Sequence, residues 1–150
     1  MSHTSRALLF AFVLAIGLCL GGSASAGAAP LPEARGLLEF ETAVNWAEVS
    51  KTWISRRPGW INEVSAATTP EQVGRLTLEL ETAMGWPSVE DSWRQERPAW
   101  AEAMAHASSS ATVAKGLLHL EAATKWSAVA EGWKAVRPDW VARMQALAGK

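Results

Sequence analysis

The middle one of three related stretches in this chain, residues 69–100, reads TPEQVGRLTLELETAMGWPSVEDSWRQERPAW and decides the fold. It opens as a helix does, because Thr69 is a good N-cap, Pro70 suits the first helical position and Gln72 can close a capping box. Leucines then recur at helical spacing, which predicts an amphipathic α-helix. Glycine is the usual residue just past a helix end, so we expect this helix to finish near Gly85.

The second half of the stretch predicts further helix. Trp86, Val89 and Trp93 are spaced i, i+3 and i+7, which places them on one helical face, and Pro87 can open that helix. Pro98 clashes with the preceding turn, so the helix should stop or kink there. We expect helices of about 15 and about 11 residues, then a segment of about 9 that is either separate or the continuation of a proline-kinked helix.

The pattern occurs three times with a constant period of 40 residues and no gaps. A small amphipathic unit cannot bury its apolar face alone, whereas three stacked copies can. The sequence therefore predicts an all-α protein of three tandem Trp-rich helical repeats, arranged as a short α-solenoid or a compact helical bundle. All nine tryptophans belong to the repeated positions: Trp46, Trp53, Trp60, Trp86, Trp93, Trp100, Trp126, Trp133 and Trp140.

The N-terminus has the pattern of a secretory signal peptide. A short segment with one positive charge, Arg6, precedes an uncharged apolar run over 7–22 and small residues ending in Ala24-x-Ala26. We expect cleavage after Ala26, with Ala28 or Ala29 as alternative sites and a retained anchor as the other outcome. The predicted location is secreted or periplasmic. The expected domains are a signal peptide at 1–26, a linker at 27–32 and helical repeats at 33–70, 71–110 and 111–150.

Cysteine usage limits how the exported chain can be stabilised. The one cysteine, Cys19, lies inside the apolar run and would leave with it. A disulfide-free domain of this size depends on its apolar core for stability. No membrane span is expected after cleavage.

Two charged positions are identical in all three repeats, a glutamate in the first helix and an arginine before the proline. A charged ligand site present three times is one interpretation. A structural ion pair within each repeat is the interpretation we favour, because such pairs are common where helices meet. The pairs are Glu41 with Arg57, Glu81 with Arg97, and Glu121 with Arg137.

No known catalytic or metal-binding motif appears in the sequence. Past the predicted cleavage site there is no cysteine, and the histidines are His106 and His119. We expect no catalytic residues, no metal and no cofactor, and hence a non-enzymatic protein. A deep pocket holding Glu121 or His119 away from Arg137 would favour a small secreted enzyme instead.

The charge balance argues against nucleic acid as a partner. Without Arg6, 13 Lys and Arg face 15 Asp and Glu, a net charge of −2. Nucleic-acid binding needs a basic surface, which this balance does not supply. The sequence does not define the oligomeric state.

The tryptophans are the candidate binding or core aromatics. Most are expected in the core, since they lie on one helical stripe with the repeated valine and recur together with the repeated Leu and Pro. Some are expected to be exposed. We predict an exported interaction or structural module of the cell envelope or extracellular space that contacts an unknown protein. A Trp-lined module that binds a glycan or an apolar molecule is the alternative. A groove of exposed Trp would favour that alternative, and a sealed Trp core with variable polar outer faces would favour the protein partner.

Overall fold

The computed structural model describes residues 28–149, and within that range the fold is all-α with no strands. The predicted signal peptide at 1–26, including Cys19, lies outside the described residues. In chain order the elements are α1 (Pro32–Ala43), α2 (Trp46–Val49), α3 (Trp53–Ala66), α4 (Pro70–Met84), the 3₁₀ turn η1 (Trp86–Ser88), α5 (Trp93–Ala105), α6 (Ser110–Ala123), the 3₁₀ turn η2 (Trp126–Ala128) and α7 (Trp133–Ala148).

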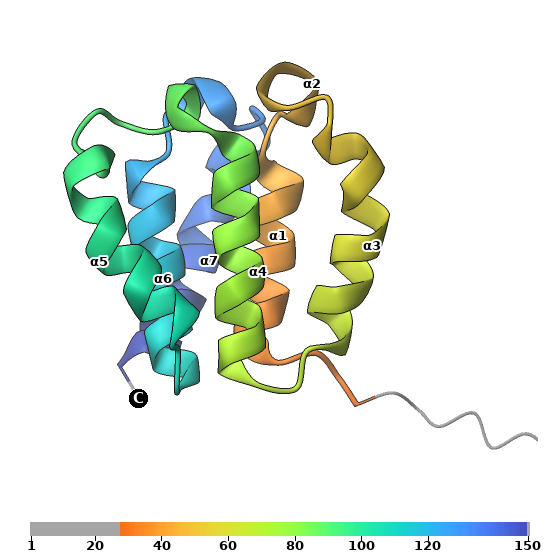
Figure 1. Ribbon diagram of the computed structural model, residues 1–150, viewed down its shortest axis with the longest axis vertical. Coiled ribbons are helices and arrows are strands. Elements are labelled where there is room, and N and C mark those ends of the chain that lie inside the picture. Colours follow the sequence, from red (N-terminus) through yellow and green to blue (C-terminus); the bar gives the residue numbers. More distant parts are fainter. Residues whose placement is uncertain (1–27, 150) are drawn as a thin grey trace, which may run out of the picture.

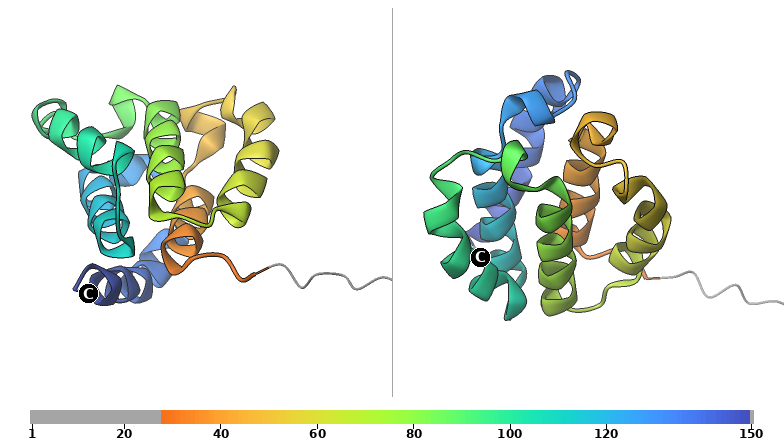
Figure 2. Two further views of the ribbon diagram at one scale, coloured as in Figure 1. Left: turned by 60° about the horizontal axis from the view of Figure 1, so that its bottom comes forward. Right: turned by 45° about the horizontal axis from the view of Figure 1, so that its top comes forward.

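The helices form an inner and an outer group (Figure 1). The inner helices α1, α4 and α6 pack against one another. Each outer helix covers a seam between two inner ones: α3 lies on α1 and α4, α5 on α4 and α6, and α7 on α6 and α1. Among the described residues, the last helix, α7, therefore packs beside the first, α1, as the views of Figure 2 show.

The start and end of α4 follow the sequence signals. The Gln72 amide donates to the Thr69 hydroxyl at 3.3 Å, and the Thr69 amide donates to the Gln72 side chain at 3.1 Å, so the predicted capping box is confirmed. Gly85 ends the helix with φ of 70°, a conformation that glycine adopts without steric cost.

The predicted helix through Trp86, Val89 and Trp93 is wrong. Trp86 begins a 3₁₀ turn, Val89 is extended and forms an isolated antiparallel bridge with Thr124, and the next helix begins only at Trp93. The bridge is held by backbone bonds of 2.8 Å from Lys125 to Ser88 and from Glu90 to Ala123. These long-range bonds satisfy the backbone groups that a continuous helix would have used, which spacing alone does not reveal.

The proline in each outer helix does not end it. Pro98 lies within α5, so the segments before and after it form one helix, the second of the two predicted outcomes. Pro98 is five residues past the helix start at Trp93, so the hydrogen bond it cannot donate would have reached Arg94 in the first turn. Little helix precedes that point, so the break costs little.

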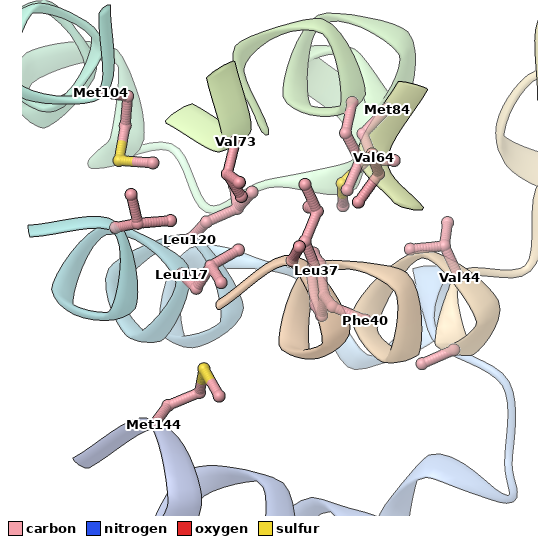
Figure 3. Packing of buried hydrophobic residues seen from close by; sticks show 14 of the residues in the cluster. Leu37, Phe40, Val44, Val64, Val73, Met84, Met104, Leu117, Leu120 and Met144 are labelled. Atoms are coloured by element: carbon pink, nitrogen blue, oxygen red, sulfur yellow. The ribbon is translucent and has the colours of Figure 1, made fainter. Parts of the chain in front are cut away.

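The core fills the space among the inner helices and beneath the outer ones (Figure 3). Leu37, Phe40 and Leu117 from inner helices are fully buried, and Met104 and Met144 reach in from outer helices. Burial of these side chains supplies the stability that a disulfide-free domain needs. Within residues 28–149, no helix is both long and apolar enough to cross a membrane.

A glycine on α4 sets how closely α5 approaches. A β-carbon at Gly74 would overlap the carbonyl oxygen of Met104. Gly74→Ala is therefore expected to lower the free energy of unfolding by about 1–3 kcal/mol, because the backbones would have to separate. Urea unfolding followed by circular dichroism measures this change.

Gly132→Ala is the matched control. No atom lies within 4 Å of the added carbon, and its φ of −63° suits alanine. This variant should be neutral or gain about 0.4–1 kcal/mol through the unfolded state. Equal unfolding midpoints for Gly74→Ala and the unmodified protein would contradict the close approach of α4 and α5.

Candidate functional site

Seven of the nine tryptophans are buried, with exposed fractions of 0–8%. Three of the seven connect an outer helix to an inner helix, because each indole N–H donates to a backbone carbonyl of an inner helix that its own helix packs against. The donor in each case is the third tryptophan of its repeat. These bonds run from Trp60 to Leu76 (3.1 Å), from Trp100 to Gly116 (2.9 Å) and from Trp140 to Gly36 (2.8 Å).

The repeated Glu and Arg meet in clusters that also include the middle tryptophan. Glu41 is fully buried and accepts hydrogen bonds from Trp53 at 3.0 Å and from Arg57 Nε at 2.6 Å. Such bonds raise the pKa of Arg57, so its guanidinium remains charged. The other clusters join Glu81 to Trp93 and Arg97, and Glu121 to Trp133 and Arg137.

The carboxylates of these clusters are hydrogen-bonded through both oxygens to their arginines. In the central cluster Glu81 is 5% exposed, and both of its oxygens accept bonds from Arg97. A carboxylate with both oxygens bound to fixed donors holds its two helices together. Glu121 is likewise bound to Arg137.

Trp86 and Trp126 differ from the other tryptophans in being exposed, at 44% and 47%. The guanidinium of Arg94 lies 4.8 Å from the Trp86 ring centroid, and that of Arg137 lies 5.0 Å from the Trp126 centroid. Neither indole N–H donates to another described residue. At the same repeat position, Trp46 is buried, donates to the Glu41 carbonyl at 2.9 Å and stacks on Trp53.

The two exposed rings lie on η1 and η2, at the end of the molecule where the inner helices finish, which is the top of Figure 1. The backbone bond from Lys125 to Ser88 joins these two turns directly. We call this surface, formed by Trp86, Trp126 and their arginines, the turn end. It presents two apolar rings, each with a cation against it.

Outside the three clusters, His119 lines a space of about 500 Å³ together with Glu96 and Lys115. His119 Nε2 lies 2.6 Å from Glu96 Oε2, and this bond lowers the pKa of Glu96. In the part of the chain that the structure describes, no three His, Cys, Asp or Glu side chains are grouped to hold a metal ion.

Glu33 is a polar group that the repeat comparison did not single out. It is fully buried, one carboxylate oxygen accepts from the Ser110 hydroxyl at 2.8 Å, and the other has no partner among the described residues. The signal was present in the sequence, because the other repeats carry Val73 and Val113 at this position. Its contact with Ser110 ties the start of α1 to the start of α6.

Comparisons with known proteins assign this chain to no family. No protein-family model, curated protein or solved structure matches the sequence or the fold.

Proposed function

We propose that this protein is an exported, non-enzymatic helical-repeat protein that acts as a protein-interaction or structural module of the cell envelope or extracellular space. In this proposal its three repeats form one closed bundle, and the turn end is the surface that contacts a partner protein. The N-terminal signal pattern supports export.

The recurring tryptophan bonds support the closed bundle. The acceptor of each bond lies sixteen residues past its tryptophan for Trp60 and Trp100. For Trp140, a position sixteen residues further on would lie past Lys150. Its indole N–H instead donates to the carbonyl of Gly36, which is the equivalent position in the first repeat. A solenoid would leave its terminal units without this contact, whereas a closed bundle satisfies all three.

The exposure of Trp86 and Trp126 carries the proposal for the turn end. Burial of Trp46 shows that the repeat can enclose this ring, so exposure at the other two positions is not imposed by the repeat pattern. Tryptophan and arginine are the residues most enriched among those that dominate binding energy at protein interfaces. The free indole N–H groups would also gain acceptors in a complex.

A glycan ligand is the second candidate, and the same rings favour it. Exposed indole faces are suited to stacking against other ring faces, and the exposed N–H can donate to a hydroxyl. The sealed core supports the protein partner more, because the tryptophans that border grooves of the described residues, Trp53, Trp100 and Trp133, are buried. An enzyme has the least support, because the one carboxylate set repeated in the chain is bound to arginine.

Site-specific photo-crosslinking distinguishes these candidates. A photoreactive side chain at position 86 or 126, in protein expressed with its own N-terminal segment, should give a discrete protein adduct. Ile54, which is 58% exposed on α3, is the matched control position and should give none. Trp86→Ala with Trp126→Ala should abolish the interaction, since losing one hot-spot side chain costs about 2 kcal/mol or more.

Other outcomes contradict the proposal. Equal adducts at position 54 would mean that the turn end has no special role. Loss of binding on a glycan array in the double variant, with no protein adduct, would establish the glycan candidate. Circular dichroism should show the double variant folded, because both rings are half exposed.

A further inference from the structure

A groove runs along the outside of the bundle where α7 lies against α1. Its volume is about 880 Å³, within the range of small-molecule sites. Leu38 on α1 and Ala135 and Val136 on α7 form its apolar walls, and Arg35 lies at one end. Its lining contains neither of the exposed tryptophans and neither of their arginines.

The groove reflects residues that are specific to the third repeat. At four of its lining positions the first two repeats carry polar residues and the third carries a small apolar one. This change makes the seam between α7 and α1 unlike its two counterparts. In repeat order the sets are Ser50, Glu90 and Ala130; Thr52, Ser92 and Gly132; Ser55, Gln95 and Ala135; and Arg56, Glu96 and Val136.

At the two positions equivalent to Val136, the first and second repeats carry charged side chains that pair across their seams. Arg56 bonds Glu79 at 2.6 Å across the seam of α3 and α4, and Glu96 bonds His119 at 2.6 Å across that of α5 and α6. Val136 cannot form such a bond, and it is 54% exposed. The seam of α3 and α4 has two separate spaces of about 490 Å³ each, both bordered by Glu79, and the seam of α5 and α6 has one of about 500 Å³. Each of these spaces is smaller than the groove.

Four charged side chains line the groove, two arginines and two acids. Arg143 bonds Glu39 with both carboxylate oxygens, at 2.6 Å and 3.1 Å, so that pair is neutral. Hydrogen bonding to Glu39 raises the pKa of Arg143, and the charge of Asp139, which forms no ion pair with a described residue, adds to this effect. Arg35 is exposed and forms no ion pair with any described residue. It lies one helical turn from Leu38, on the same face of α1.

We propose that this groove binds an aliphatic carboxylate, with the chain along Leu38, Ala135 and Val136 and the carboxylate on Arg35. The apolar walls favour the chain through burial of its surface. A guanidinium pairs with a carboxylate through two parallel hydrogen bonds, which fixes the direction of the ligand. This site goes beyond the proposed function and involves neither exposed tryptophan.

Calorimetric titration of the purified protein, expressed with its own N-terminal segment, tests the site with decanoate as the probe. We expect saturable binding at one site, and Val136→Arg, which installs the first-repeat residue, should weaken it at least tenfold. Arg35→Gln should remove the preference for decanoate over decanol. Arg75→Gln, at the same position of the second repeat, is the matched control and should bind as the unmodified protein does.

Three results would overturn the proposal: no saturable binding of decanoate, unchanged binding by Val136→Arg, or equal effects of Arg35→Gln and Arg75→Gln. Sedimentation of the unmodified protein and of Val136→Arg tests whether a second copy of the chain occupies the groove instead. A dimer that Val136→Arg dissociates, with no decanoate bound, would make the groove a contact between copies. All of these outcomes leave the crosslinking result at the turn end unaffected.

Discussion

Trp93→Ala is expected to lower the free energy of unfolding by about 3–5 kcal/mol, the range for truncating a fully buried aromatic side chain. Trp93 has no exposed surface, packs edge-on against Trp100 with ring centroids 5.0 Å apart, and donates to Glu81 at 2.9 Å. The substitution removes a large apolar volume and leaves a buried carboxylate with one donor fewer. Urea unfolding followed by circular dichroism measures the loss.

Trp86→Ala is the matched control, because it removes the same side chain from the same repeat. This ring is 44% exposed and its indole N–H bonds to no described residue, so little stability should be lost. Similar losses for the two variants would contradict the division of the tryptophans into core and surface. An unchanged unfolding midpoint for Trp93→Ala would contradict the core itself.

Arg97→Ala is expected to cost less, about 1–3 kcal/mol, because it leaves the buried Glu81 carboxylate without its charged partner. Glu81 is 5% exposed, and Arg97 donates to both of its oxygens at 2.8–3.0 Å. The Arg97 side chain itself is 31% exposed, so water can partly replace it. Thermal and urea unfolding at neutral pH should both report the loss.

Two further variants define what Arg97 contributes. Arg97→Lys should recover only part of the stability, since an ammonium group cannot reproduce the two parallel bonds of a guanidinium. Arg75→Ala breaks an exposed pair with Glu71 and should change stability by less than about 0.5 kcal/mol. Full stability in Arg97→Ala, combined with loss of partner crosslinking, would make the Glu–Arg pair a binding site.

Local sequence signals predicted the helix ends that depend only on residues close by in the sequence. The capping box of Thr69 and Gln72 and the glycine end at Gly85 act over a few residues, and both are present. The all-α class followed from the helical spacing of apolar residues. The continuity of each outer helix through its proline was one of two predicted outcomes.

The segment from Trp86 to Trp93 could not be predicted from its own spacing. Val89 occupies a helical stripe in the sequence, yet it pairs with Thr124, which lies 35 residues further along the chain. Such pairing depends on where α6 lies, which local propensity does not contain. The same limit applies to the groove, because its four apolar substitutions form a site only when α7 lies beside α1.

The division of tryptophans at the turn end also required the structure. Trp46, Trp86 and Trp126 occupy equivalent repeat positions, so the sequence gives them one prediction. Trp46 begins α2, a four-residue helix, and stacks on Trp53 with centroids 5.0 Å apart. Trp86 and Trp126 begin three-residue 3₁₀ turns and are exposed.

Acrylamide quenching of intrinsic tryptophan fluorescence tests most directly whether seven rings form the core and two form the turn end. Shielded, blue-shifted emission with a minor accessible component is the expected result, and Trp86→Phe combined with Trp126→Phe should remove that component. Ready quenching of most of the emission from the folded protein would contradict the core. An accessible component that persists in the double variant would contradict the turn end.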